Sequence, residues 1–174
     1  MHAPIEQPSE WVARWAHLIE RGPVLDVASG GGRHARLFAA RGLEVVAVDR
    51  EPQSIAGVSF VQADLEDGSP WPFAGRRFGA IVVTNYLHRP LLPVLERSLA
   101  ENAIVIYETF MAGNERFGKP SNPAFLLRPG ELLEAFRGLT PVAFEQGIVA
   151  APRSAAIQRL CATRGAIGAV RIAP

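Results

Sequence analysis

Val24-Leu-Asp-Val-Ala-Ser-Gly-Gly-Gly32 is the stretch of the chain that decides its fold. Its first five residues form a short apolar run with one carboxylate, Asp26, which is typical of a buried strand. The glycines that follow predict a tight turn. After them, apolar side chains over 35–40 continue at helical spacing, and the pattern ends near Gly42. A strand, a glycine turn and a helix in this order predict the opening unit of a parallel sheet.

Two further apolar runs lead into acidic residues. Residues 42–49 predict a second strand that ends in Asp49, and residues 58–62 predict a third strand that leads into Asp64. Because the carboxyl ends of parallel strands meet at one edge of a sheet, we expect a ligand to lie across that edge. Asp26, Asp49 and Asp64 would be its polar contacts. An adenosine-bearing ligand would need such a contact at each of the three places.

The rest of the chain continues the alternation of strands and helices. The remaining expected elements are strands at 78–84, 103–110, 141–149 and 155–163, and helices at 91–99 and 129–136. The turn at 150–154 is short, so the last two strands should pair antiparallel. The connector at 51–57 leaves little room for a full helix. The prediction is an α/β fold with a Rossmann-like, mostly parallel seven-stranded sheet, helices on both faces and an antiparallel C-terminal strand pair.

A helix is also expected before the first strand, over about residues 9–20. Ser9 can cap it, and Glu10 stands in the favoured first turn. Trp11 and Trp15 recur in it at helical spacing, together with aliphatic residues. We expect this helix to cover one face of the sheet, with its tryptophans either in the core or stacked on a substrate ring.

Length, composition and charge limit the class of protein. The chain has 174 residues, 48% of them hydrophobic, which suits a single domain with a real core. No apolar run reaches the roughly 20 residues that span a bilayer, and the first residues lack a secretory signal pattern, so we expect a soluble, cytoplasmic protein. The net charge of +1 argues against a nucleic-acid partner bound by general electrostatics. The single cysteine, Cys161, is expected to be a buried hydrophobe, and no metal site of recognisable spacing is present.

The glycine turn admits two chemical interpretations. Residues 30–35 fit the G-x-G-x-x-A fingerprint of a dinucleotide-binding dehydrogenase, in which Asp49 would take the ribose hydroxyls. Such an enzyme needs no carboxylate on the first strand, where Asp26 stands close to the place of the phosphates. A sulfonium ligand with an α-amino group is cationic, and Asp26 would favour it. Each of the three acids could also serve only the backbone, as a cap or turn residue.

At these residues the chain resembles the class I S-adenosylmethionine-dependent methyltransferases, whose first motif runs acid-x-Gly-x-Gly-x-Gly. The chain has Asp26-Val-Ala-Ser-Gly-Gly-Gly32 at this place, so Ala28 stands where the motif has its first glycine. Because Ala28 has a Cβ, we expect its φ to be negative and the departure from the motif to be mild. The resemblance is strong over 24–65 and extends in arrangement to Phe110.

The resemblance implies a cofactor contact for each part of the sheet edge. Asp26 and Gly30 would border the methionine part of S-adenosylmethionine, and Asp49 would bind the ribose hydroxyls. Asp64 and the Leu65 backbone would meet the adenine. The implied cofactor residues are Asp26, Ala28, Gly30, Gly32, Asp49, Arg50, Asp64, Leu65 and Asn85.

Two shorter motifs give a narrower resemblance. Residues 85–90, Asn-Tyr-Leu-His-Arg-Pro, follow the fourth strand, and residues 107–110, Tyr-Glu-Thr-Phe, end the fifth. Together they are similar to small bacterial methyltransferases of the tellurite-resistance type. The two prolines that amino-methylating relatives often carry after the fourth strand are missing here, which argues against a nucleobase as acceptor.

Methyl transfer from a sulfonium requires an aligned nucleophile and a dry site, and a base is optional. If the acceptor is a hydroxyl or a cationic amine, His88 is the candidate base because its pKa lies near neutrality. Asn85 would position the reactants. His88 could equally cap the following helix, and Arg33 could hold the cofactor carboxylate or be solvated.

The acceptor is expected to enter over the long loop at 111–128, which is rich in Gly, Asn and Pro. Its cations and aromatics would suit an anionic or aromatic small molecule, and the loop would become ordered when the acceptor binds. The alternative is a loop held in place by its own polar groups. The expected function is methyl transfer from S-adenosylmethionine to a small molecule, with S-adenosylhomocysteine as product, by a monomer or homodimer. A NAD-dependent oxidoreductase, a non-catalytic adenosine-cofactor-binding domain and an RNA acceptor are the alternatives.

Overall fold

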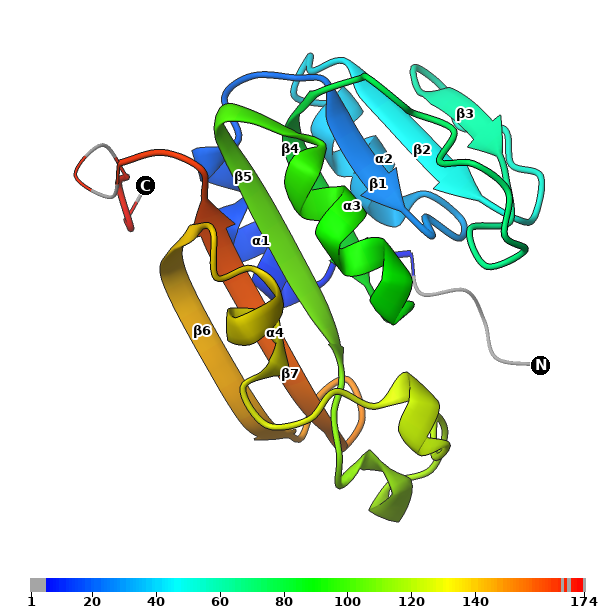
Figure 1. Ribbon diagram of the computed structural model, residues 1–174, viewed down its shortest axis with the longest axis vertical. Helices are drawn as coiled ribbons and strands as arrows, with labels where there is room; N and C mark the ends of the chain where they lie inside the picture. The colour runs from blue at the N-terminus through cyan, green and yellow to red at the C-terminus, as the bar shows by residue number, and fades with distance from the viewer. Residues whose placement is uncertain (1–5, 167, 169, 174) are drawn as a thin grey trace.

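A seven-stranded sheet forms the centre of the computed structural model, which describes residues 6–166, 168 and 170–173 (Figure 1). Its strand order is β3-β2-β1-β4-β5-β7-β6. The first five strands in this order are parallel, and β7 runs antiparallel to both β5 and β6. The strands are β1 Val24–Val27, β2 Val45–Asp49, β3 Ser59–Gln62, β4 Phe78–Thr84, β5 Leu99–Phe110, β6 Thr140–Val149 and β7 Ala155–Thr163. The predicted fold class and its antiparallel C-terminal pair are confirmed.

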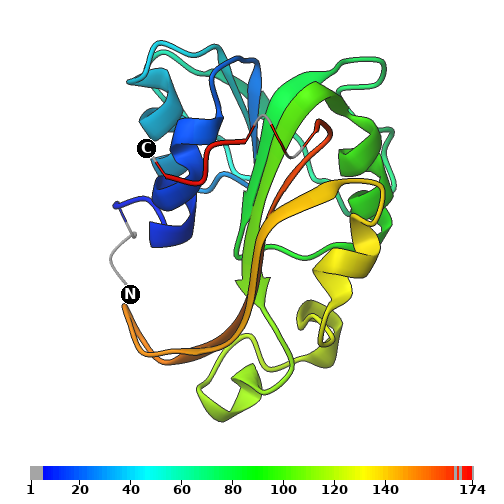
Figure 2. The same ribbon diagram turned by 90° about the vertical axis from the view of Figure 1, so that its left-hand side faces the viewer.

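Helices cover both faces of this sheet, as Figure 2 shows from the side. On one face lie α1 (Glu10–Trp15) and α2 (Arg33–Ala39), and on the other lie α3 (Leu92–Arg97) and α4 (Glu131–Ala135). Each pair of helices packs in its own hydrophobic cluster against the side chains of one sheet face. Short 3-10 helices accompany them: η1 Ala16–Leu18, η2 Arg89–Leu91, η3 Asn114–Arg116 and η4 Pro123–Phe125. Within the described residues, no helix combines the length and the apolar character that crossing a membrane requires.

The helix before the first strand begins where the sequence predicts. Ser9 Oγ accepts hydrogen bonds from the backbone N–H groups of Trp11 (3.2 Å) and Val12 (3.3 Å), which identifies it as the N-cap of α1. The side chains of Trp11 and Trp15 are buried in the core, so they do not form a stacking surface for a substrate. Cys161 is fully buried as well, and burial raises the pKa of its thiol to about 12.

Some element boundaries differ from the sequence prediction. The helix expected over 91–99 is shorter, because Leu99 already pairs with Phe78 at the start of β5. β5 therefore begins four residues before the expected Ala103, across an irregularity that includes Asn102 with φ of 59°. The connectors at 50–58 and 63–77 form turns without a helix, and β3 remains only partly buried.

The strand order places a reversal at the middle of the sheet. β1 pairs with β2 on one side and with β4 on the other, so the connections leave β1 and β4 in opposite directions. In open α/β sheets, ligands bind outside the carboxyl ends of the strands at such a switch point. The glycine turn after β1 lies there (Figure 1).

Candidate active site

The carboxylate of Asp26 is buried between β1 and the first turn of α2. Its Oδ2 accepts a hydrogen bond from the backbone N–H of Ala35 at 2.9 Å. Burial raises the pKa of Asp26 to about 7, against the opposite effects of this hydrogen bond and of Arg33. The backbone interaction considered from the sequence is therefore present. Above about pH 7, Asp26 also brings negative charge to the N-terminal end of α2, where backbone donors would otherwise attract an anion.

The turn after β1 corrects one expectation. Ala28 has a φ of 51°, in the left-handed region, and the predicted negative φ is wrong. Gly30 and Gly32 share this conformation, with φ of 50° and 77°. The turn thus needs a left-handed residue where the class I motif has its first glycine. Ala28 adopts that conformation at a cost of roughly 1–2 kcal/mol.

The backbone of the glycine turn is open to close approach by a ligand. A Cβ at Gly30 or Gly31 would have no atom within 4 Å, whereas one at Gly32 would clash with Ile55. Beside this turn, the hydroxyl of Ser29 is buried and has no hydrogen-bond partner among the described residues. An open backbone, an unpaired hydroxyl and the nearby Asp26 fit the amino-acid part of a cationic sulfonium ligand.

Asp49 joins the end of β2 to the glycine turn. Its Oδ2 accepts a hydrogen bond from Gly30 N–H at 2.8 Å, and its Oδ1 accepts one from Glu51 N–H at 3.0 Å. A carboxylate has about four acceptor positions, so capacity remains for the hydroxyls of a ligand. Arg50, the next residue, is exposed and forms a 3.7 Å ion pair with the equally exposed Glu51.

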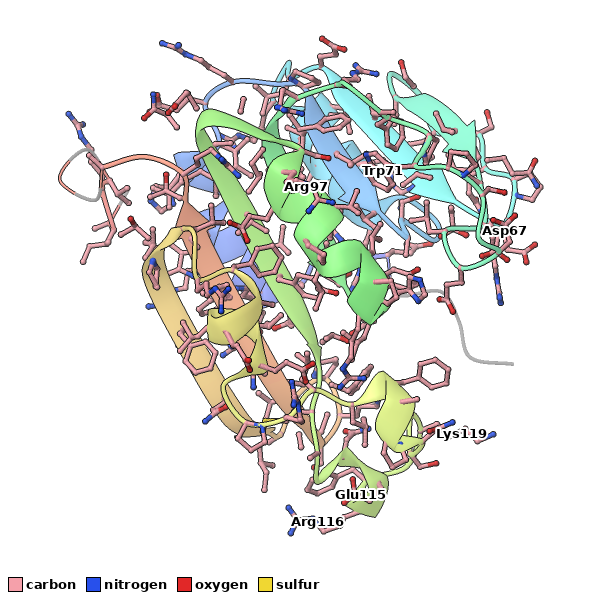
Figure 3. All side chains as sticks on the ribbon, in the orientation of Figure 1. Asp67, Trp71, Arg97, Glu115, Arg116 and Lys119 are labelled. Carbon is pink, nitrogen blue, oxygen red and sulfur yellow. The ribbon has the colours of Figure 1, made fainter. Side chains whose placement is uncertain are left out.

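Two hollows lie along the carboxyl edge of the sheet. The first hollow, of about 800 Å³, is bounded by residues 62–72, Arg50, His88 and the beginning of α3. Asp64 and Leu65 line it, and Asp64 Oδ1 accepts a hydrogen bond from Glu66 N–H at 2.9 Å. Trp71 also lines it, with a buried indole N–H that lacks a partner among the described residues. Figure 3 labels Trp71 and Asp67, which come from the same loop after β3.

The second hollow, of about 550 Å³, lies on the other side of the β4 end. Its walls are residues 7–10, the start of α2 at Arg33, the ends of β4 and β5, and the β6–β7 hairpin. Figure 2 shows this hairpin curving toward the face that carries α1 and α2. Asn85 lines the hollow, with φ of 55° and its backbone N–H bonded to Glu108 O at 2.9 Å.

A hydrogen-bonded network connects the walls of the second hollow. Ser9 N–H donates to His34 Nε2 at 3.0 Å, and Ser9 Oγ–H donates to Glu108 Oε1 at 2.7 Å. Arg159 Nη1 donates to Glu108 Oε2 at 3.2 Å. Burial lowers the pKa of His34 to about 3, so its imidazole is neutral and Nε2 can accept. The network fixes the beginning of α1 to α2, β5 and β7.

The two residues proposed for chemistry lie in different hollows. His88 lines the first hollow, and Asn85 lines the second. The side chain of His88 makes no capping hydrogen bond to the helix that follows it. Arg33 lines the second hollow and donates to Gln7 O at 3.1 Å. Burial lowers the pKa of Arg33, although Glu108 and Asp26 act in the opposite direction.

The loop at 111–128 is held by polar contacts to the rest of the protein. Asn114 is buried, its Oδ1 accepts from Ala156 N–H at 3.1 Å, and its Nδ2 donates to Pro120 O at 2.9 Å. Arg89 donates to Ala124 O and Leu126 O, each at 2.8 Å. No residue of this loop is among the described residues that line either hollow. In Figure 3, the labelled loop residues Glu115, Arg116 and Lys119 point away from the sheet.

Two residues of the sheet edge were missed in the sequence. Burial raises the pKa of Tyr86 above its usual range, and Glu66, Asp64 and Asp49 add to the effect, which places Tyr86 among the acids. Glu108 lies at the end of β5 beside Asn85. The sequence feature that could have identified them is a polar residue at the end of a continuous apolar strand or directly after it. Among the described residues, no group of three or more His, Cys, Asp or Glu side chains could hold a metal ion.

The fold and the edge define a class of protein: an open α/β sheet with a glycine turn at its switch point and acids at successive strand ends. Residues 24–106 match the family of the methyltransferase domain. No curated protein sequence matches the chain. The match covers 83 of the 174 residues, and it confirms the resemblance of this stretch to the class I S-adenosylmethionine-dependent methyltransferases.

Solved structures share the fold at low sequence identity. TehB from Haemophilus influenzae has a TM-score of 0.71 at 16% identity, and the match covers 88% of this chain and 61% of TehB, so this chain spans less than two thirds of TehB. A Burkholderia thailandensis 1,6-didemethyltoxoflavin-N1-methyltransferase has a TM-score of 0.64 at 20% identity, covering 89% and 76%. That structure contains 1,6-didemethyltoxoflavin and S-adenosylhomocysteine. The [4+2]-cyclase SpnF also has a TM-score of 0.64, at 14% identity, covering 88% and 78%.

Proposed function

We propose that this protein transfers a methyl group from S-adenosylmethionine to a small-molecule acceptor and releases S-adenosylhomocysteine. One observation carries the choice of cofactor. The buried carboxylate of Asp26 accepts the N–H of Ala35 at the beginning of α2. This is the place where a dehydrogenase of the same fold would hold a pyrophosphate. Above about pH 7, where Asp26 is ionised, a pyrophosphate would meet a carboxylate there, whereas the ammonium and sulfonium groups of S-adenosylmethionine would be attracted to it.

Different residues at the carboxyl edge of the sheet would bind different parts of the cofactor. Asp26 and the open backbone of Gly30 and Gly31 would hold the methionine part, and Asp49 would accept hydrogen bonds from the ribose hydroxyls. The first hollow, with Asp64 and Leu65, would take the adenine. The cofactor supplies an electrophilic methyl group when it is bound. The protein aligns the acceptor with that group and keeps water out, which can account for much of the acceleration.

The second hollow is the place that we assign to the acceptor. It is lined by Asn85, the residue that directly follows β4. A volume of about 550 Å³ is within the range of small-molecule sites. The 1,6-didemethyltoxoflavin-N1-methyltransferase of the same fold was solved with bound 1,6-didemethyltoxoflavin, which supports an acceptor of this size. His88 faces the first hollow, so we do not assign it the role of a base toward an acceptor in the second.

Isothermal titration calorimetry with S-adenosylhomocysteine tests the cofactor assignment. We expect the wild-type protein to bind it and not to bind NAD. Asp49→Ala removes the acceptor for the ribose hydroxyls, so affinity should fall roughly 10- to 100-fold. Glu44→Ala is the matched control, because Glu44 is an exposed carboxylate that precedes β2 at the opposite edge and pairs only with Arg76 among the described residues.

Two outcomes would contradict the proposal. Binding of NAD in place of S-adenosylhomocysteine would assign the protein to the oxidoreductase class. Binding of S-adenosylhomocysteine without release of labelled methyl product, across a broad screen of small acceptors, would contradict the transfer step. The second outcome must be tested because a [4+2]-cyclase shares this fold, so the fold alone does not establish methyl transfer.

A further inference from the structure

Glu108 is a charged residue at the end of β5 that the cofactor assignment does not use. It follows the buried run 103–107 and lies on the sheet face that carries α1 and α2, where its side chain lines the second hollow. The exposed fraction of that side chain is 15%, so the carboxylate is accessible from the hollow and otherwise enclosed. Its backbone carbonyl accepts the N–H of Asn85, which fixes it next to the β4 end.

The carboxylate of Glu108 is held rigidly and still has acceptor capacity. Ser9 Oγ–H donates to Oε1 at 2.7 Å, and Arg159 Nη1 donates to Oε2 at 3.2 Å. Each oxygen therefore receives one hydrogen bond, while a carboxylate offers about four acceptor positions in total. The oxygens of an ionised carboxylate can accept but cannot donate. A ligand group that hydrogen-bonds to Glu108 must therefore present an N–H or O–H.

Both groups that hold Glu108 are fixed in turn. Ser9 caps α1 and donates its own N–H to the neutral His34. Arg159 donates from Nε (2.9 Å) and Nη2 (2.6 Å) to Glu145 Oε2, and its guanidinium lies 4.8 Å from the ring centroid of Trp11. A carboxylate supported in this way keeps one orientation, which is the requirement for selecting a ligand group by geometry.

The hollow around Glu108 is also lined by apolar side chains. Phe110, Val149 and Ile157 line the same hollow, and the guanidinium of Arg153 lies 5.9 Å from the ring centroid of Phe110. These apolar side chains suit a planar, apolar body, since such contacts give affinity while a few polar groups fix orientation.

We infer that Glu108 binds the methyl acceptor and selects small molecules that carry an N–H or O–H donor on a planar, apolar body. The inference rests on the proposed function for its meaning, but the binding itself requires neither the cofactor nor turnover. Asn85, one of the expected cofactor residues, donates its backbone N–H to the carbonyl of Glu108, which would bring the cofactor close to Glu108. The donor atom and the methylated atom of the acceptor would therefore be the same atom or direct neighbours. In this role Glu108 is a specificity-determining residue.

Ligand pairs in which methylation removes every N–H or O–H donor test the inference in the wild-type protein. The pairs are phenol with anisole, benzyl alcohol with benzyl methyl ether, and aniline with N,N-dimethylaniline. Protein-observed NMR titrations give the dissociation constants, with and without S-adenosylhomocysteine. We expect the donor-bearing member to bind roughly tenfold or more tightly, with shifts at Phe110 and Ile157. Equal affinities within pairs, shifts elsewhere, or no binding by any member would overturn the inference.

Two matched variants separate Glu108 from the ion-pair network. Glu108→Met replaces the carboxylate with an apolar side chain of similar length and should abolish the difference within each pair. Glu145→Met removes the other carboxylate that holds Arg159 and lies outside the described lining of the hollow, so the difference should remain. A persistent difference in Glu108→Met would overturn the inference. Loss of the difference in both variants would also overturn it, because the network and not Glu108 would then be responsible.

Failure of the proposed function would look different. If the wild-type protein does not bind S-adenosylhomocysteine by calorimetry, the cofactor assignment fails, while the titrations without that ligand still decide whether Glu108 selects donors. Calorimetry on both variants also checks the fold, because the cofactor contacts of Asp26, Asp49 and Asp64 lie outside the changed positions.

Discussion

Ala28 occupies the position where the class I motif has its first glycine, and its φ of 51° lies in the left-handed region. For an L-residue with a Cβ this conformation costs roughly 1–2 kcal/mol. The turn imposes it, because the chain must leave β1 and enter α2 within a few residues, with Gly30 and Gly32 also at positive φ. The left-handed backbone conformation is therefore present at Ala28, although the residue itself departs from the motif.

Ala28→Gly should stabilise the protein. Relief of the left-handed conformation outweighs the larger entropy that glycine gives the unfolded chain, which is about 0.5–1 kcal/mol. We expect a net gain of roughly 0.5–1 kcal/mol in the free energy of unfolding, measured by urea titration. Ala39→Gly in α2 is the control and should cost about 1 kcal/mol. A loss at Ala28 as large as that at Ala39 would contradict the conformation described.

At the scale of elements, α4 and η2 hold the loop at 111–128. Glu131 in α4 is buried, and its carboxylate accepts from Arg89 Nε at 2.7 Å and from Arg89 Nη2 at 3.0 Å. It also accepts the backbone N–H of Arg128 at 2.7 Å. Burial alone would raise the pKa of Glu131, but these hydrogen bonds outweigh it and lower the pKa. Arg89 in turn donates to carbonyls of the loop, so this carboxylate contributes to holding the loop in place.

Glu131→Ala should destabilise the protein by roughly 2–4 kcal/mol, because it leaves a half-buried guanidinium without its bidentate partner. Limited proteolysis should then cut more rapidly within 111–128. Glu134→Ala on the same helix is the control, since Glu134 is exposed and its contact to Arg128 is 3.8 Å. Its effect should stay below about 1 kcal/mol. Unchanged proteolysis in Glu131→Ala would contradict the assigned contacts.

At the scale of the whole molecule, the sequence predicts the sheet better than the site. β4 and β7 were predicted to the residue, β4 because a buried strand of a parallel sheet covered on both faces is a continuous apolar run. The early start of β5 was missed, since pairing of Leu99 with Phe78 across a polar interruption leaves no periodic pattern. Asp26, Asp49 and Asp64 could be predicted as site candidates, because each lies near the end of a strand that the local sequence reveals. The second hollow depends on the β6–β7 hairpin meeting residues 7–10, a long-range contact that no local pattern contains.

The stability of the whole molecule should vary with pH through two buried groups with opposite signs. Asp26 has its pKa raised from 3.8 to about 7, chiefly by burial. The stability it contributes is fully present below pH 3.8 and is lost as pH rises through about 7, because only the folded state holds the proton in between. His34 has its pKa lowered from 6.5 to about 3, again chiefly by burial. Its contribution is fully present above pH 6.5 and is lost as pH falls through about 3.

Between about pH 4 and pH 6.5 the two slopes oppose each other, each at about 1.4 kcal/mol per pH unit. We therefore expect their sum to be nearly flat in the wild-type protein and each slope to emerge when the other group is removed. Relative to wild type, Asp26→Asn should gain stability as pH rises through this window. His34→Gln keeps an acceptor for Ser9 N–H and should gain stability relative to wild type as pH falls. Urea titrations of the three proteins at half-unit pH steps measure both differences, and parallel curves for all three would show that neither group is buried in the ionisation state described.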